Sequence, residues 1–504
     1  MSAAASSSSS SSRPSADKTD SPSIAELIDA MPIDEHETAP DGERAVGYQQ
    51  ALQDLLADLA LRPIPTNRLG RLWILTSLQA KIGAAYFAWW LRKWYKNADA
   101  QQRALNDAHM KAAFRMLGSM SYLRGAAMKF GQMLANYPDV MPSEFTEVLG
   151  SLHFEAPAMH YSLLREFITR ELGRDPEDVF DDFETEAFAA ASLGQVHRAR
   201  LKESGRPVAV KVQYPNIART IESDLKNLKA VFAPMRMHPD WDSMMNGYED
   251  IRRMLALECD YEHEAENLRV ARLAFADRND IVVPRVYDDY STRRVLTMDL
   301  LDDGLHLRQY LETNPSQEER DRYGELIAHS TLRLSYGERL LHADPHPANY
   351  VFLNDGRLGL LDFGCCVRYS EDDLKYVLKA EQAFRSGSEE RIIEACAHAG
   401  CATPKQRADK ERMLMLKAWG DWVWETQEED RVFDFSDISY IRRGAEIYTE
   451  LLRRRYVRSR PVNTWLTRAF FGIRAMLTEL RARVNYYQIW REYSDRYYSW
   501  EQEE

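Results

Sequence analysis

The alternation of apolar and polar positions is clearest in the central part of the chain, where it predicts short strands. Residues 208–213 read Val-Ala-Val-Lys-Val-Gln, a pattern that places Lys211 among apolar neighbours. Two further apolar runs, at residues 350–353 and 358–361, flank the tight-turn sequence Asn-Asp-Gly at residues 354–356. We therefore expect these two runs to form a β-hairpin.

Helical patterns surround these strands. Helices are predicted at residues 162–172, 217–232, 248–276 and 318–336, and from about residue 371 onward. Additional strands are predicted at residues 195–201, 281–286 and 294–300. The pattern thus indicates an α+β protein in which a small strand-rich lobe lies between helical regions.

Composition sets outer limits on function. The chain has 504 residues, 45% hydrophobic and 28% charged, which is ordinary for a soluble protein with a large core. Its net charge of −13 offers no positive field for phosphate backbones, so nucleic acid is not expected as a partner. The five cysteines form no spaced metal-binding set, which favours a reduced, cytoplasmic environment.

The first 45 residues are predicted to be a disordered tail. They contain a serine run at residues 6–12 and an acidic stretch with few aromatic residues, a composition that buries too little surface to offset its ordering entropy. The tail has no signal-peptide segment, and its acidity argues against a mitochondrial transit peptide.

Residues 72–91 are the segment most relevant to membranes. They are mostly apolar and long enough to span a bilayer, but Lys81 near the centre would cost roughly 2.5–3.5 kcal/mol there. Basic flanks and the tryptophans Trp89, Trp90 and Trp94 suit a helix lying at the lipid surface. We expect peripheral contact with the inner face of a membrane, ahead of a buried packing helix and of a true span.

One stretch has the residue types and spacing of a phosphoryl-transfer site. His342 and Asp344 precede Asn349, and an Asp-Phe-Gly begins at Asp362, thirteen residues further on. Asp362 and Asn349 would bind Mg²⁺ against nucleotide phosphates. Asp344 would orient or deprotonate the nucleophile, and His342 would brace the loop. The predicted hairpin would bring both metal ligands to one place.

The upstream parts of a kinase site are partly present. Lys211 is where a phosphate-contacting lysine is expected, and Glu264 is the best candidate for its ion-pair partner. Residues 299–301 would form the hinge, with Asp299 and Leu301 presenting backbone groups to adenine.

Before the lysine strand, where a G-x-G-x-x-G is expected, there is an alanine-rich loop instead. Its candidate nucleotide contacts are Ala189, Ala190, Ala191, Ser192, Gly194 and Gln195. Since alanine adopts positive φ less readily than glycine, this loop argues against an ordinary protein kinase.

The motifs together resemble the UbiB-like, or aarF-domain, family of atypical kinases linked to ubiquinone and other isoprenoid-lipid metabolism. Lys129-Phe-Gly-Gln132 resembles the family's K-x-G-Q signature, the loop at residues 189–195 its alanine-rich loop, and Glu258 with Asp260 its E-x-D pair. One departure is Ala348, where the family usually has glycine; it leaves Asn349 in place.

The resemblance implies an unusual kinase. In this family the K-x-G-Q segment folds over the active site, so the chain is expected to bind ATP or ADP with Mg²⁺ and to hydrolyse ATP rather than phosphorylate proteins. Lys129 and Gln132 would then be active-site residues, and Glu258 and Asp260 would seat the segment. Expected partners are the nucleotide, a lipid or membrane surface and quinone-biosynthesis proteins.

The expected fold is therefore a protein-kinase-like bilobal fold with additional helices at both ends. Its parts are the tail at 1–45, a helical N-terminal extension at 46–182, an N-lobe at 183–301 and a helical C-lobe at 302–504. Two alternatives to the ATPase remain open: a nucleotide-binding pseudokinase scaffold and a small-molecule phosphotransferase of the aminoglycoside-kinase type. The four residues Lys211, Asp344, Asn349 and Asp362 count against the first, and the K-x-G-Q and alanine-rich motifs count against the second.

Overall fold

A computed structural model describes residues 160–191, 193–232, 236, 241–343, 345–398, 409–454, 456 and 461–497. The predicted tail, the membrane-relevant segment and the K-x-G-Q residues Lys129 and Gln132 lie outside this part of the chain, as do Ser192 and Asp344. The predictions made for them are therefore not addressed by the fold.

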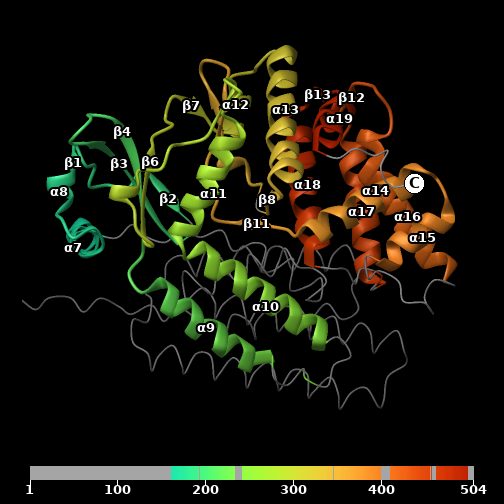
Figure 1. Cartoon of the computed structure of the whole chain (residues 1–504), viewed down its shortest axis with the longest axis horizontal. Coiled ribbons are helices and arrows are strands. Elements are labelled where there is room, and N and C mark those ends of the chain that lie inside the picture. Colours follow the sequence, from blue (N-terminus) through green and yellow to red (C-terminus); the bar gives the residue numbers. More distant parts are fainter. Residues whose placement is uncertain are drawn as a thin grey trace, which may run out of the picture.

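The first lobe is built on a five-stranded antiparallel sheet (Figure 1). Its strand order is β1-β3-β4-β6, with β2 beside β3. The strands are β1 (Phe180–Asp181), β2 (Ala189–Ala191), β3 (Gly194–Leu201), β4 (Pro207–Gln213) and β6 (Val295–Asp299). In β4 the side chains of Val208, Val210 and Val212 are fully buried on one face. They pack with α7 (Tyr161–Leu172), near α8 (Pro176–Val179), so the predicted strand at 208–213 is confirmed.

The helices inserted in this lobe differ from the prediction at one point. Helix α9 (Ile217–Phe232) has the predicted bounds, but the single helix predicted at 248–276 is two helices, α10 (Trp241–Glu258) and α11 (Tyr261–Ala274). The break occurs because Asp260 is an N-cap: its side chain accepts hydrogen bonds from the amides of Glu262 and His263.

The strand predicted at residues 281–286 was assigned to the wrong sheet. It is shorter, β5 (Ile281–Val282), and pairs in parallel with β10 of the second lobe, while Val286 forms an isolated bridge to Met298. A two-residue strand has too little alternation to identify its partner, because pairing is decided by tertiary contacts.

The predicted hairpin is confirmed and forms the centre of the second lobe. Its strands are β9 (Tyr350–Leu353) and β10 (Leu358–Leu360), joined by a turn in which Gly356 has a φ of +83°. The sheet order is β5-β10-β9-β7, where β7 is Gly304–Leu305. Beside it, β8 (Leu340–His342) pairs with β11 (Cys366–Arg368). The strand that leads into the predicted catalytic loop, residues 342–349, is therefore the neighbour of the strand that follows the Asp-Phe-Gly.

Helices make up most of the second lobe, as predicted. They are α12 (Leu307–Glu312), α13 (Gln317–Leu332), α14 (Glu371–Arg385), α15 (Glu389–His398), α16 (Lys410–Trp424), α17 (Ile438–Arg453), α18 (Pro461–Leu480) and α19 (Tyr486–Tyr497). A small sheet of β12 (Phe433–Asp434) and β13 (Arg483–Val484) lies among them. Among the described helices, none combines the length and apolar composition needed to cross a bilayer.

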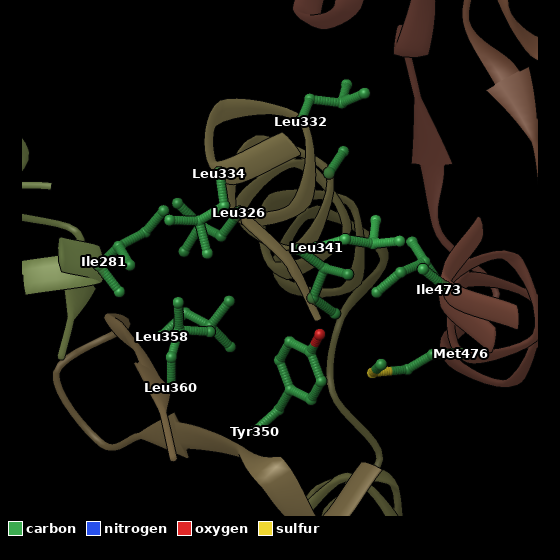
Figure 2. Packing of buried hydrophobic residues seen from close by; sticks show 14 of the residues in the cluster. Ile281, Leu326, Leu332, Leu334, Leu341, Tyr350, Leu358, Leu360, Ile473 and Met476 are labelled. Atoms are coloured by element: carbon green, nitrogen blue, oxygen red, sulfur yellow. The ribbon is translucent and has the colours of Figure 1, made fainter. Parts of the chain in front are cut away.

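A continuous apolar core holds strands β8, β9 and β10 against these helices. Figure 2 shows Leu358 and Leu360 of the hairpin near Leu326 of α13, and Leu341 of β8 facing Ile473 of α18. All five side chains are at most 4% exposed. Burying each contributes about 1.5–3 kcal/mol relative to exposure, so the strands that carry the site are fixed by the core.

A buried carboxylate also lies in this lobe. Glu381 of α14 has no exposed surface. The hydroxyl of Tyr336 donates to it at 3.5 Å, and Arg385 one helical turn later is 3.9 Å away. Tyr336 belongs to a π-helical turn at Arg333–Gly337, shortly before strand β8. Burial raises the pKa of Glu381 to about 8, because it outweighs the lowering of this pKa by the Arg385 charge.

This pKa predicts a pH-dependent stability. The folded-state pKa exceeds the ordinary value of 4.5, so the folded protein binds the extra proton, and stability falls as pH rises from about 4.5 to about 8. Glu381→Gln cannot ionise, and we expect it to match wild type near pH 5 and to be more stable at pH 8.5 by on the order of 4 kcal/mol. Urea unfolding at both pH values measures this difference. Glu371→Gln, at an exposed position of the same helix, is the control; identical pH profiles for wild type and Glu381→Gln would contradict the assignment.

Candidate active site

A buried ion pair in the first lobe contacts a carboxylate of the second lobe. The Lys211 ammonium on β4 contacts both carboxylate oxygens of Glu264 on α11, at 2.8 and 2.9 Å. The two side chains are 7% and 1% exposed. Lys211 also lies 3.3 Å from a carboxylate oxygen of Asp362. The fold therefore brings together three predicted site residues that are far apart in the sequence.

The charge state of Lys211 follows from these neighbours. Burial lowers the pKa of the lysine, but the carboxylates of Asp362 and Glu264 more than offset this effect, and the pKa lies well above 10.5. The Tyr261 ring lies 5.1 Å from the ammonium and adds a cation–π contact. Lys211 is thus a fixed positive charge beside a partly exposed carboxylate.

Asp362 has an unusual backbone conformation. Its φ is +39°, in the left-handed region that residues other than glycine rarely adopt. His342 donates from Nε2 to the Asp362 carbonyl at 2.9 Å, and the amide of Gly364 donates to one Asp362 carboxylate oxygen at 3.1 Å. These bonds fix the carboxylate, whose side chain is 36% exposed and contacts Lys211 of the first lobe. The contact with His342 fits the bracing role expected for it.

Asn349 is delivered to the same region by the hairpin. It ends a 3₁₀ turn, Pro347–Asn349, and its carbonyl accepts a hydrogen bond from the amide of Leu361, the residue before Asp362. The two predicted metal ligands are therefore linked through the backbone. One carboxylate and one amide oxygen fit Mg²⁺, which takes few protein ligands and completes its octahedron with water and phosphate oxygens. No group of three or more His, Cys, Asp or Glu side chains arranged for a metal occurs among the described residues.

The two acidic residues Glu258 and Asp260 lie at the junction of α10 and α11. Glu258 is 8% exposed. Burial raises the pKa of Glu264 to about 7, and the carboxylates of Asp362 and Glu258 add to this effect. Asp260 caps α11 and also forms an ion pair with Arg293 at 3.1 Å. Its carboxylate thus helps to start the helix that carries Glu264, a structural role that does not depend on the K-x-G-Q segment.

The alanine-rich loop forms a tight hairpin at the edge of the first sheet. Strand β2 (Ala189–Ala191) pairs with the start of β3, where Ala190 lies opposite Gln195. A Cβ added to Gly194 would lie 2.2 Å from the Val212 carbonyl oxygen, so only glycine fits there.

Gln195 is not brought toward Lys211. It pairs with Val212, and alternate residues of a strand face opposite sides, so its side chain lies on the other face of the sheet from Lys211. There it is 1% exposed and 2.8 Å from His197. A nucleotide contact by Gln195 is therefore restricted to its backbone.

The predicted hinge follows the last strand of the sheet. The carboxylate of Asp299 accepts hydrogen bonds from the Arg285 amide at 3.0 Å and the Tyr287 hydroxyl at 2.7 Å. The side chain of Asp299 is therefore hydrogen-bonded to the segment at residues 285–287. Leu301 lies against Gly359 of β10, where a glycine Cβ would come 3.1 Å from its Cδ1. The hinge thus connects the two sheets, and only its backbone groups remain for a nucleotide base.

Two residues of the site were missed in the sequence. Asn267 of α11 is 1% exposed and donates to the Phe363 carbonyl at 3.1 Å, which ties the Asp-Phe-Gly to the helix that carries Glu264. Tyr261 contacts Lys211 from the same helix. Positions 261, 264 and 267 are three residues apart and therefore share one helix face. This spacing of polar residues around Glu264 could have indicated that Tyr261 and Asn267 belong to the site.

Comparison with known proteins identifies a kinase-like domain in this chain. Residues 151–396 match the family model described as an ABC1 atypical kinase-like domain. A solved structure described as a complex of Rv3197 with erythromycin, from Mycobacterium tuberculosis, superimposes with a TM-score of 0.52 at 24% identity, covering 78% of this chain and 98% of that chain. This likeness concerns the fold, and with the family match it confirms the predicted α+β, kinase-like architecture.

Two curated relatives align over most of the chain. One is a probable serine/threonine-protein kinase, abkA, of Dictyostelium discoideum, 27% identical over 462 residues that cover 86% of this chain and 80% of the relative. The other is the mitochondrial atypical kinase COQ8 of Saccharomyces cerevisiae, 28% identical over 468 residues that cover 90% of each chain.

Proposed function

The chain belongs to the UbiB-like family of ABC1 atypical kinases, and from this premise we propose that it is an ATPase acting in isoprenoid-lipid metabolism at a membrane surface. Its nucleotide would be ATP or ADP with Mg²⁺. The kinase-like relatives support phosphoryl transfer in general; the hydrolysis of ATP, the pathway and the membrane are the parts proposed.

The observation that carries the proposal is the contact of Lys211 with both Glu264 and Asp362. In protein kinases a lysine held by a helix glutamate contacts the phosphates, and the aspartate of the Asp-Phe-Gly binds the metal. A chain that used this fold only as a scaffold would not need to bury the Lys211 ammonium and the Glu264 carboxylate beside a partly exposed Asp362. Burying a charged group costs several kcal/mol per ion before pairing.

Each residue of the site has a role in the proposed reaction. Lys211 would neutralise charge on the phosphates, Asp362 and Asn349 would hold Mg²⁺, and the hinge from Asp299 to Leu301 would present backbone groups to the base. Asp344 follows the fully buried Ala343, whose amide donates to the Cys365 carbonyl at 3.0 Å. We propose Asp344 as the residue that orients the attacking water.

The membrane and pathway proposals rest on the family and on the sequence. The yeast relative is a mitochondrial atypical kinase, and the UbiB-like family is linked to ubiquinone metabolism. Residues 72–91, with their basic and tryptophan-rich flanks, are the proposed lipid contact. The compartment in which this chain works stays a prediction.

Phosphate release from ATP tests this function. Purified full-length protein is assayed with and without liposomes that contain anionic lipid, beside an Asp344→Asn variant. We expect turnover that lipid stimulates and that the variant lacks. Nucleotide binding without turnover in either condition would favour a scaffold instead.

The alanine-rich loop gives a second test. Ala190→Gly frees the backbone of β2 beside the proposed phosphate site, and glycine costs about 0.5–1 kcal/mol more to order in a strand than alanine. We expect a change of several-fold in ATP or ADP affinity, or the appearance of self-phosphorylation, measured by calorimetry and by labelled phosphate incorporation. A variant indistinguishable from wild type would remove the loop from the nucleotide site.

A further inference from the structure

A cavity lies among the C-terminal helices, away from the proposed nucleotide site. Its volume is about 170 Å³, and α14, α15, α16, α17 and α18 all contribute to its wall. The lining is mainly aromatic and aliphatic, and includes Trp419, Trp422, Phe470 and Phe471. An apolar cavity of about 150 Å³ is large enough to hold a benzene ring, so this one has room for a ring or a short chain.

Among the described residues that line this cavity, Arg474 of α18 is the one that carries a charge. It is 2% exposed, and its guanidinium lies 5.2 Å from the ring centroid of Trp422 and 6.0 Å from that of Phe470. One terminal nitrogen donates to the Val423 carbonyl at 2.5 Å and to the Thr426 hydroxyl oxygen at 3.5 Å. The Nε of Arg474 has no hydrogen-bond partner, and no carboxylate pairs with the guanidinium among the described residues.

An arginine buried in this way is unusual on energetic grounds. Burying a cation costs several kcal/mol unless an anion compensates, and a buried donor left unsatisfied costs a further ~1–3 kcal/mol. Lys211, the buried cation of the proposed nucleotide site, has two carboxylate partners. Arg474 has aromatic rings, the Val423 carbonyl and the Thr426 hydroxyl instead, so among the described residues the cavity supplies apolar surface and a positive charge but no anion.

The helix that carries Arg474 also touches the catalytic loop. A Cβ added to Gly472 would lie 2.6 Å from Cγ of Pro345, so the backbone of α18 packs directly against the residue that follows Asp344. On the same helix, Ile473 packs in the core close to Leu341 of the catalytic strand (Figure 2). A displacement of α18 would therefore act on the catalytic loop through direct contact.

We propose that this cavity binds a small apolar carboxylate, and that its occupancy alters the catalytic loop through α18. The ring or short chain would lie among Trp419, Trp422 and Phe470, and the carboxylate would pair with Arg474. The effect on the catalytic loop rests on the proposed ATPase function, whereas the binding itself does not.

Calorimetric titration of the full-length protein tests the binding. The probes are 4-butylbenzoate, its neutral isostere 4-butylbenzamide, and octanoate as an aliphatic acid. We expect the benzoate to bind at least tenfold more tightly than the amide, and octanoate to show whether an acyl chain also fits. Equal affinities for benzoate and amide, or no binding of either acid at millimolar concentration, would overturn the proposal.

Three variants locate the site. Arg474→Met should reduce benzoate affinity to that of the amide, and Ala380→Phe, which fills the cavity from α14, should weaken all probes at least tenfold. Arg491→Met is the matched control, because Arg491 also lies over a tryptophan ring but outside the cavity lining, and it should leave affinities unchanged. Unchanged benzoate binding in either cavity variant would overturn the location. If Arg474→Met does not fold, Ala380→Phe still tests the location of the site, and the comparison of acid with amide still tests the recognition of the carboxylate.

Phosphate release then tests the link to the catalytic loop. Saturating 4-butylbenzoate should change turnover at least twofold in wild type and leave Ala380→Phe unaffected. Turnover that the bound ligand does not alter would overturn the link through α18. An absence of turnover in every condition would contradict the proposed ATPase function. The calorimetric result would still show whether the cavity binds the carboxylate.

Discussion

Lys211→Met is expected to abolish ATP turnover and to destabilise the fold. The ammonium lies 2.8 Å from Glu264 and 3.3 Å from Asp362, and both lysine and glutamate are buried. Methionine keeps the length and apolar stem but leaves two carboxylates near each other without a cation. Breaking one partner out of a buried pair typically costs about 3–5 kcal/mol of folding free energy. The loss of positive charge at the phosphates should lower turnover at least about 100-fold.

The pairing predicts a particular pattern in a double-mutant cycle. Adding Glu264→Gln to Lys211→Met removes the uncompensated carboxylate, so it should restore part of the lost stability while turnover stays low. Urea unfolding and phosphate release measure the two effects separately. Lys417→Met, which breaks an exposed pair with Asp421 on α16, is the control and should change stability by at most ~1 kcal/mol. A double variant as unstable as the single one would show that the pair is not the source of the effect.

Asp362→Asn should remove Mg²⁺-dependent nucleotide binding while the fold stays intact. Asparagine tolerates the left-handed backbone better than most residues, so the φ of +39° at this position is no obstacle. The variant also keeps an oxygen for the Gly364 amide, and Lys211 keeps Glu264 as its partner. What disappears is the negative charge of a metal ligand. We expect turnover to fall at least about 100-fold and stability to change by no more than ~1 kcal/mol.

Calorimetry with ATP, in the presence and absence of Mg²⁺, measures this effect directly. Wild type should bind more tightly with the metal, and the variant should show no such dependence. Asp355→Asn, in the exposed turn of the same hairpin, changes the charge by the same amount only a few residues away and should bind and turn over as wild type does. Hydrolysis unaffected by Asp362→Asn would place the metal elsewhere.

Local patterns in the sequence identified the hairpin of β9 and β10 and the strand that carries Lys211. The hairpin was predictable because Asn-Asp-Gly at residues 354–356 specifies a tight turn and the flanking apolar runs specify strands. The lysine strand was predictable because Val208, Val210 and Val212 alternate with residues of the other face. Both depend on neighbours within a few residues, where local preferences are strongest.

Tertiary structure alone decided which distant groups meet. The pairing of β5 with β10, the helix break at Asp260 and the contact of Asn267 with Phe363 depend on how separate segments pack. The placement of Gln195 on the face opposite Lys211 depends on strand register, which a single strand does not reveal. Sequence determined the chemistry, because residue types and short spacings carry it. The Lys211–Glu264–Asp362 contact and the cavity around Arg474 arise only when the core brings their helices and strands together.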